Sequence, residues 1–460
     1  MREFYLETAC YVLVSIIVGL ALAMLIMPVF NNFTQSMLSI DFGSPQLYIF
    51  LVGLLVCVVL LSGSFPALYM TRFNVLETLS GKFKGKKASL FQKSLVITQF
   101  TASIALLIVV AFMQKQVKYI LSYDLGFNKE NVIYVQGRGK FEQNFQTLEG
   151  EFLKEPSIIS VTRKDGLPTT WNDGMTVKRV PDDNSFTSII ERINVSPNYF
   201  DFFEMKIIDG ENPFFLQSST WRDVVINESA ARLLGYENPL GEMIGTDWGD
   251  RFIIRGVVRD AYTKSLQQGV DPQIYYRLNI NSTWNPVFFK ISGDPQRAIR
   301  FIEQKWKERE VDYPFEYHFL DDTYKQLYTL EMNAGKVFAF AMLIALMITV
   351  AGLFAMAYYA IQRRVREIAI RKVYGASIKD IFVLLNKDFV LWVVIAFVIA
   401  CPIAYFGLQK WLSGFVVKTS LNIWVFLLMG ALAFMITLLT TGYQTWKTAT
   451  ENPVKALKTE

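Results

Sequence analysis

Six long apolar stretches are the feature that most constrains this chain. They cover residues 9–29, 47–69, 94–113, 337–359, 389–408 and 423–441. Each is close to the ~20 residues that an α-helix needs to cross the hydrocarbon core of a bilayer. Hydrophobic residues make up 52% of the 460 residues, which is typical of a membrane protein. We therefore predict six transmembrane helices.

The basic residues predict the orientation of these helices, because cytoplasmic loops are enriched in Lys and Arg. The loop between the second and third spans carries six of them: Arg72, Lys82, Lys84, Lys86, Lys87 and Lys93. A second basic cluster, residues 363–379, separates the fourth and fifth spans. In contrast, residues 31–45 contain no basic residue, and residues 413–422 contain only Lys418. We expect the two basic loops and both termini in the cytoplasm.

Between the third and fourth spans the composition changes to that of a soluble domain, which this topology places outside the cytoplasm. Strands are predicted at residues 132–135, 224–226, 252–258, 274–278 and 287–291 from their β-branched and aromatic content. Asn227 and the Asp294-Pro295 pair are typical helix starts, and Gly235 is a typical helix end. The predicted fold is therefore an α-helical membrane protein with six transmembrane helices and one extracytoplasmic α+β domain.

The segment of residues 361–380, which joins the fourth and fifth spans, carries an ordered set of charges. Arg363, Glu367 and Arg371 are spaced four residues apart, so they would form one ladder on a helix. One interpretation is that this cluster only fixes the topology of the chain, and the charge alone favours that interpretation. The ordered pattern R-x-x-E-I-x-I-R-K-x-x-G-A-S, residues 364–377, favours a docking element instead.

The same segment has an apolar face and a turn. Its apolar residues at helical spacing predict an amphipathic helix lying in the headgroup layer with that face down: Val365, Ile368, Ala369 and Val373. Gly375 can adopt the left-handed conformation that ends a helix, and Ser377 with Asp380 can cap the next one. The chain is expected to return into the membrane there.

Residues that could support catalysis or ligand chemistry are scarce. Residues 81–87 have the composition of a phosphate-binding loop but the wrong spacing. The single histidine, His318, lies in an alternating run that favours a strand. Cys10, Cys57 and Cys401 lie in apolar runs, which excludes a disulfide framework. We expect no catalytic residue, cofactor or metal site, and a net charge of +5 gives little support for nucleic-acid binding.

The pattern in residues 364–377 resembles the cytoplasmic segment of FtsX/MacB-like ABC-transporter permeases. Further stretches that resemble this family occur in order along the chain: residues 64–69, 93–100, 124–127, 195–200, 225–228 and 256–260. The resemblance implies a MacB-type periplasmic domain and a segment that receives a partner ATPase. The ATPase-coupling residues that it implies are Arg363, Arg364, Arg366, Glu367, Arg371, Lys372, Gly375, Ala376 and Ser377.

The resemblance also implies a domain organisation. Residues 1–92 would be the end of a first FtsX-like permease repeat, and residues 93–115 a membrane helix leading to a stalk. Residues 116–333 would be the MacB-like domain, and residues 334–460 a second FtsX-like permease domain. Residues 74–79 and 452–457 are similar and would mark the ends of the two repeats. The chain is therefore expected to lack the N-terminal part of a longer two-repeat permease.

The function implied is that of a non-enzymatic permease subunit in the bacterial inner membrane. It would couple ATP hydrolysis by a cytoplasmic ABC ATPase subunit dimer to movement of the outer domain, for export or efflux of peptides, antibiotics or lipoproteins. Further partners are the lipid bilayer, a second permease copy or the missing N-terminal half, and a periplasmic adaptor. Two rivals stay open: a transmembrane regulator that controls a cell-wall hydrolase or senses a ligand, and a membrane-anchored enzyme, which the missing catalytic residues oppose.

Overall fold

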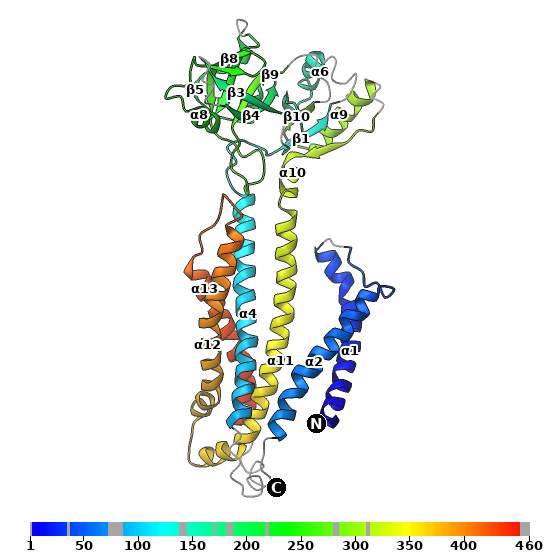
Figure 1. Ribbon diagram of the computed structural model, residues 1–460, viewed down its shortest axis with the longest axis vertical. Helices are drawn as coiled ribbons and strands as arrows, with labels where there is room; N and C mark the ends of the chain where they lie inside the picture. Colours follow the sequence, from blue (N-terminus) through cyan, green and yellow to red (C-terminus); the bar gives the residue numbers. More distant parts are fainter. Residues whose placement is uncertain are drawn as a thin grey trace. The chain divides into compact units, whose positions relative to one another are not determined.

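The computed structural model describes residues 2–34, 37–71, 86–137, 145–167, 169–170, 173–180, 187–216, 220–278, 285–309 and 313–450 (Figure 1). The chain divides into two compact units, which we describe separately. The helical unit comprises Met1–Gln114, Glu331–Lys410 and Ser420–Glu460. The sheet unit comprises Lys115–Leu330 together with a short distant segment, Trp411–Thr419.

Long helices make up the helical unit: α1 (Arg2–Thr34), α2 (Pro45–Thr71), most of α4 (Lys86–Leu121), α11 (Thr329–Val373), α12 (Ile378–Leu412) and α13 (Ile423–Thr450). Within the described residues, five segments are long and apolar enough to cross a membrane: Tyr5–Thr34, Lys93–Leu121, Thr329–Gln362, Lys379–Leu412 and Ile423–Lys447. They coincide with five of the six predicted spans.

The remaining predicted span, residues 47–69, coincides with α2. Its described apolar part, Pro45–Leu60, is shorter than a membrane span, and most of the side chains beyond it lie outside the described residues. The sixth transmembrane helix therefore stays a prediction. Both copies of the short repeat, residues 74–79 and 452–457, also lie outside the described residues.

Helix α4 is the most enclosed of the five candidate spans, because 44% of the residues in its most apolar stretch are buried within the protein. It contacts α11 through small and polar residues. The hydroxyl oxygens of Ser103 and Thr349 are 2.8 Å apart, which is a hydrogen-bonding distance. A Cβ placed on Gly352 would lie 3.2 Å from Oε1 of Gln99, so only a small residue permits this approach of the two helices.

Two β-sheets form the framework of the sheet unit. The first has the strand order β11-β1-β10-β2 and is antiparallel throughout. The second has the order β5-β8-β6-β9-β4-β3-β7, and β7 also pairs with β8, which closes a ring of strands. Within it, β6–β8 and β4–β9 are parallel pairs. The strands are β1 (Val132–Gln136), β2 (Ile158–Arg163), β3 (Gly174–Arg179), β4 (Thr187–Val195), β5 (Ile207–Gly210), β6 (Asp223–Asn227), β7 (Met243–Thr246), β8 (Arg251–Val258), β9 (Gln273–Arg277), β10 (Pro286–Ile291) and β11 (Tyr317–Phe319).

Short helices cover these sheets: α6 (Phe145–Phe152), α7 (Tyr199–Phe202), η1 (Pro213–Phe215), α8 (Glu228–Leu234), α9 (Pro295–Glu308) and α10 (Leu320–Gln326). The predicted starts of α8 and α9 are confirmed. The Asn227 side chain accepts a hydrogen bond from the backbone N–H of Ala230 at 2.8 Å, and Asp294 accepts one from Gln296 at 3.0 Å. Asx caps of this kind satisfy the backbone donors that a helix start leaves open.

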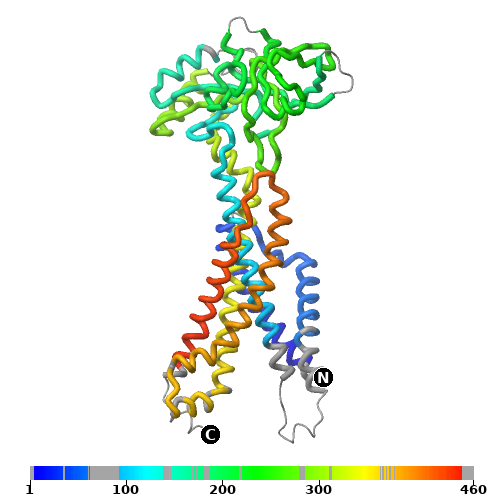
Figure 2. Tube along the Cα trace, turned by 90° about the vertical axis from the view of Figure 1, so that its left-hand side faces the viewer, coloured from blue at the N-terminus to red at the C-terminus, as the bar shows by residue number. Residues whose placement is uncertain are grey.

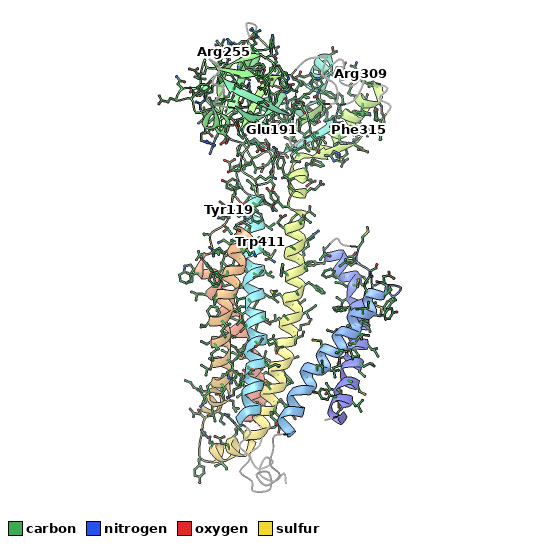
Figure 3. The ribbon with its side chains drawn as sticks, viewed as in Figure 1. Tyr119, Glu191, Arg255, Arg309, Phe315 and Trp411 are labelled. Carbon is green, nitrogen blue, oxygen red and sulfur yellow. The ribbon has the colours of Figure 1, made fainter. Side chains whose placement is uncertain are left out.

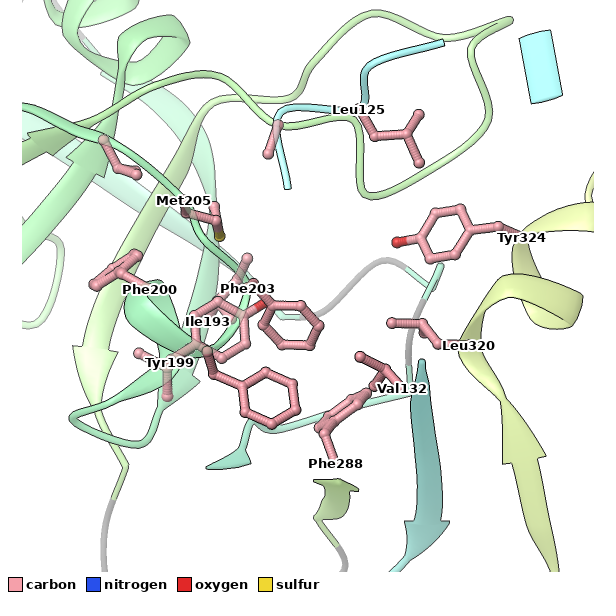
Figure 4. Packing of buried hydrophobic residues seen from close by; sticks show 14 of the residues in the cluster. Leu125, Val132, Ile193, Tyr199, Phe200, Phe203, Met205, Phe288, Leu320 and Tyr324 are labelled. Carbon is pink, nitrogen blue, oxygen red and sulfur yellow. The ribbon is translucent and has the colours of Figure 1, made fainter. Parts of the chain in front are cut away.

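An aromatic-rich core joins the two sheets. It includes residues from β1, β4, β9, β10, α7 and α10. Figure 4 shows Tyr199 and Phe203 beside Phe288, with Val132 and Leu320 next to them. The ring centroids of Phe203 and Phe288 are 5.5 Å apart in an edge-on arrangement, which suits the charge distribution of aromatic rings. The two sheets therefore share one core and belong to one domain.

Candidate functional site

The segment of residues 361–380 begins within α11 and ends within α12, at the turn that Figure 2 shows between these helices. Helix α11 continues without interruption to Val373. Gly375 then has a φ of 88°, a conformation that residues with a Cβ rarely adopt. The N–H of Ala376 donates to the carbonyl oxygen of Arg371 at 3.0 Å, as in a Schellman motif. The predicted helix end at Gly375 is confirmed.

The start of α12 is capped as its sequence predicts. The backbone N–H of Asp380 donates to Oγ of Ser377 at 3.2 Å, and the N–H of Ser377 donates to Oδ2 of Asp380 at 3.0 Å. This reciprocal pair is a capping box. The turn is therefore defined by hydrogen bonds on both sides of Gly375, which gives the segment a fixed shape.

Of the predicted apolar face of this segment, only Ile368 has a described side chain, and that side chain is buried in protein. Ile368 has 3% of its surface exposed and packs in a cluster with Ile361 of α11 and with Ile381 and Leu385 of α12. For Ile368, the expectation that the apolar face points into the headgroup layer is wrong, because α12 covers this side chain. The side chains of the other predicted face residues, Val365, Ala369 and Val373, lie outside the described part.

The charged face is exposed. Glu367 and Arg371 form an ion pair of 2.7 Å, with 46% and 51% of their side chains exposed. Arg364 lies 3.7 Å from Asp388 of α12. The side chains of Arg363, Arg366 and Lys372 lie outside the described part, so the proposed ladder is seen only at its Glu367–Arg371 step.

Two further side chains at this turn were not among the predicted residues. Tyr374 is 87% exposed and Ile370 is 50% exposed. Ile370 lies in the last turn of α11, and Tyr374 lies between the end of this helix and Gly375. An aromatic residue immediately before a helix-ending glycine is a sequence signal for an exposed side chain, because the helix stops there and leaves this residue uncovered. Tyrosine and arginine are enriched among residues that dominate binding at protein interfaces.

In the sheet unit, residues 259–272 form what we call the base loop. Three other segments of this unit hydrogen-bond to it: the residues after α4, the stretch from α10 to the start of α11, and the connection Trp411–Thr419. The N–H of Tyr262 donates to the carbonyl oxygen of Leu125, just after α4, at 2.8 Å. The hydroxyl of Tyr324 in α10 donates to the carbonyl oxygen of Thr263 at 2.8 Å. The N–H of Leu266 donates to the hydroxyl of Tyr328, directly before α11, at 2.8 Å.

The third segment is Trp411–Thr419, the connection from α12 to α13. Phe415 and Val417 are buried in the aromatic-rich core, with 5% and 7% of their surfaces exposed. The N–H of Val417 donates to the carbonyl oxygen of Leu266 at 3.3 Å. Gln116 of α4 binds both sides of this segment, donating to the carbonyl oxygen of Val417 and accepting from the N–H of Thr419. The sequence alone predicts only an outer loop here, without these contacts.

Comparison with known families accounts for both regions. Residues 339–453 match the family described as FtsX-like permease C-terminal. Residues 100–298 match the family described as MacB-like periplasmic core domain. The two matches together cover more than half of the chain. This protein belongs to the MacB/FtsX-like ABC permeases. It is a membrane protein with a periplasmic domain, and its family is not itself catalytic.

Solved structures with similarity to the permease are periplasmic or extracellular domains. The periplasmic region of MacB from Actinobacillus actinomycetemcomitans is 18% identical, covers 45% of this chain and 96% of its own, and has a TM-score of 0.33. A domain from Porphyromonas gingivalis, described as part of a permease protein, is 16% identical over 42% and 90%, with a TM-score of 0.32. The extracellular domain of the noncanonic ABC-type transporter YknZ from Gram-positive bacteria is 15% identical over 41% and 98%, with a TM-score of 0.29. These scores are too low for the likeness to carry an argument. No curated protein matches the chain.

A buried polar cluster in the permease holds the base loop against β4. Glu191, 1% exposed and located in the second sheet (Figure 3), accepts hydrogen bonds from Lys264 at 3.2 Å and from Gln273 at 3.0 Å. Lys264 also binds Asp271 at 2.5 Å. Within the described residues, no group of histidine, cysteine and carboxylate side chains could hold a metal ion. The cluster pairs opposite charges inside one domain, so we assign it a structural role.

Lys164, at the edge of this cluster, gives a pH-dependent prediction. Burial lowers the pKa of Lys164 to about 8. The positive charge of Lys264 also lowers this pKa, whereas the nearby carboxylates of Asp165 and Glu191 raise it. Between pH 8 and about 10.4 the unfolded chain thus binds more protons than the folded one, so the free energy of unfolding should rise with pH, by at most about 3 kcal/mol. Thermal unfolding of Lys164→Met between pH 7.5 and 9.5 should lack this rise. The exposed-site variant Lys307→Met should keep it, and a rise that persists in Lys164→Met would contradict the assignment.

Proposed function

We propose that this permease works in the bacterial inner membrane and transmits ATP-driven motion from a cytoplasmic ATPase dimer to its periplasmic domain. Residues 361–380 would receive the ATPase, and the sheet unit would move in response. The cargo class that fits the family is a peptide, antibiotic or lipoprotein that is exported or moved on the periplasmic side. Catalysis of ATP hydrolysis would belong to the partner chain.

The observation that carries this proposal is the set of contacts at the base loop. Every chain segment that leads from the sheet unit to α4, α11, α12 or α13 is hydrogen-bonded to it, through Leu125, Tyr328 and Val417. The loop is bound in turn to β4 of the second sheet through Lys264 and Glu191. A displacement of any of these helices would therefore act on one loop that is fixed to the sheet, which is what a mechanical relay requires.

The shape of residues 361–380 supports the docking part of the proposal. The turn is held by a Schellman motif and a capping box, so its backbone has a fixed shape. Tyr374 and Ile370 provide apolar area, and the exposed pair of Glu367 and Arg371 provides charge. A rigid surface of this mixed character loses little conformational entropy when a partner binds.

Glu367→Lys is expected to abolish co-purification of the partner ATPase while leaving the permease folded. The lost pair is exposed, so its local cost should be about 0.5 kcal/mol. Placing a cation against a surface that has adapted to a carboxylate costs several times more, because like charges then face each other. Tyr374→Ala should weaken the same interaction by removing an exposed aromatic contact. The measurement is ATPase recovery with affinity-purified permease, together with stimulated ATP hydrolysis.

Glu303→Lys is the matched control. Glu303 is the acidic member of another exposed pair at the same spacing, 2.6 Å from Lys307 on α9 of the sheet unit. This variant should retain the ATPase. If Glu367→Lys and Tyr374→Ala both retained it as well, with unchanged stimulation, residues 361–380 would have only a topological role.

A further inference from the structure

A cavity of about 560 Å³ opens between the two sheets of the periplasmic domain. One wall comes from the first sheet and its helix α6, and the other from the ends of β4 and β9 and from η1. The residues on which the argument depends are Phe145, Glu149, Arg163, Phe215, Arg277 and Leu278. The volume lies within the range of small-molecule sites.

Hydrogen bonds hold the residues after β4 that line this cavity, and two of these residues are bound to β2 of the first sheet. The N–H of Ser196 donates to the carbonyl oxygen of Arg163 at 2.9 Å. The Asn198 side chain donates to the carbonyl oxygen of Val161 at 2.8 Å and accepts from the hydroxyl of Thr162 at 2.9 Å. Asn212 donates to the carbonyl oxygen of Pro197 at 2.8 Å, which holds η1 at the rim. The cavity is therefore preformed.

The charges around the cavity favour an anion. Its described lining carries two guanidinium groups, Arg163 and Arg277, and one carboxylate, Glu149. Arg163 is 5% exposed, and its guanidinium carbon lies 4.1 Å from the centre of the Phe145 ring. Burial raises the pKa of Glu149, while Arg163 opposes this rise.

The remaining lining is apolar and partly open. Phe215 is 57% exposed, whereas Phe214, the preceding residue of the same short helix η1, is 1% exposed. The N–H of Leu278 donates to the carbonyl oxygen of Val195, which holds Leu278 at the cavity edge. A rim of apolar side chains beside two arginines suits a molecule that has both an apolar body and an acidic group.

We propose that this cavity binds an organic carboxylate with an apolar body, with the C-terminal end of a short hydrophobic peptide as its ligand. The carboxylate would lie between Arg163 and Arg277, and the hydrophobic side chains would pack on Phe145, Phe215 and Leu278. A bidentate guanidinium–carboxylate pair supplies orientation as well as binding energy. This inference does not rest on the ATPase-docking role of residues 361–380.

The test is calorimetric titration of the full-length permease in detergent, without nucleotide, using N-acetyl-leucyl-phenylalanine and its C-terminal amide. The acid should bind with saturation, and the amide should bind about tenfold more weakly, since it lacks the charge-assisted hydrogen bonds. Decanoate, added as a competitor, tests whether the site also accepts the carboxylate of a fatty acid. If decanoate displaces the peptide, fatty acids share the site; if it does not, the site is selective for peptides.

Two variants separate binding from folding. Arg277→Ala, at an exposed position, should weaken the acid about tenfold and remove most of its advantage over the amide. Glu149→Gln should instead strengthen binding of the acid, because it removes the only carboxylate of the described lining. Arg222→Ala is the control, since Arg222 is, like Arg277, an exposed arginine of this domain but does not line the cavity.

Equal binding of acid and amide, or no saturable binding of either, would overturn the proposal. An unchanged acid-to-amide ratio in Arg277→Ala would also overturn it. Because these measurements need no ATPase, their failure would leave the coupling role of residues 361–380 untouched, and loss of that role would leave the cavity untouched.

Discussion

Phe415→Ala should release the Trp411–Thr419 segment from the core of the periplasmic domain. Truncating a buried phenylalanine costs about 3–5 kcal/mol, since contacts are lost and a cavity remains. Phe415 is 5% exposed and stacks edge-on against Trp411 at 5.2 Å. If the segment opens locally by about 3 kcal/mol more easily, the amide of Val417 should exchange with deuterium about 100-fold faster.

Hydrogen exchange of the full-length permease in nanodiscs measures this effect, with the amide of Val417 as the probe. Phe406→Ala is the matched control, because Phe406 lies on the same helix α12 but is 67% exposed. It should leave the exchange of Val417 unchanged. Equal exchange in the wild type and in Phe415→Ala would show that Phe415 does not hold this segment, and the relay would then lose its connection to α12 and α13.

Lys264→Met should lower the stability of the periplasmic domain by about 3–5 kcal/mol, because it leaves the carboxylate of Glu191 buried without its cation. Glu191 is 1% exposed and Lys264 is 11% exposed, so water cannot replace the lost partner. For a domain of this size the loss corresponds to an unfolding temperature about 10 °C lower. Thermal unfolding followed by circular dichroism measures this change.

The double variant Lys264→Met/Glu191→Gln should recover most of the loss, since no buried charge then remains. Lys307→Met removes the cation of the exposed pair with Glu303 and should change stability by less than about 0.5 kcal/mol. A decrease of similar size in Lys307→Met and Lys264→Met would contradict the assignment of a buried ionic cluster. A double variant no more stable than Lys264→Met would contradict it too.

The parts of the fold that local sequence signals specify could be predicted. The five predicted strands correspond to β1, β6, β8, β9 and β10, all of which have mostly buried, β-branched or aromatic residues. Helix caps could be predicted too, because they act within one turn of chain and depend only on adjacent residues. Examples are Asn227, Asp294 and Gly375. The strand position of His318 in β11 is confirmed for the same reason.

The parts that depend on distant contacts could not be predicted. Strands β3 and β4 alternate polar and apolar residues irregularly and are stabilised by pairing with each other and with β7 and β9. The burial of Ile368 against α12 was missed because an apolar helix face reads the same whether it meets lipid or protein. Likewise, Phe415 and Val417 stand in a short loop, where nothing in the sequence separates membrane-flanking residues from core residues.

The coupling residues themselves stay a prediction. The structure specifies the turn at Gly375 and the exposed pair of Glu367 and Arg371, but a docking role belongs to a surface that only a bound partner would define. Tyr374 was omitted from the predicted residues because a tyrosine beside a membrane helix resembles an ordinary interfacial residue.

The base loop makes its hydrogen bonds with the other three segments through its own main chain. The atoms involved are the N–H of Tyr262, the carbonyl oxygen of Thr263, and both backbone groups of Leu266. These hydrogen bonds do not depend on the identity of the side chain at each position, although the Leu266 side chain is itself buried in the core. Relatives with little sequence identity can keep the same mechanical connection, and a scan of side-chain substitutions along this loop would underestimate how much depends on it.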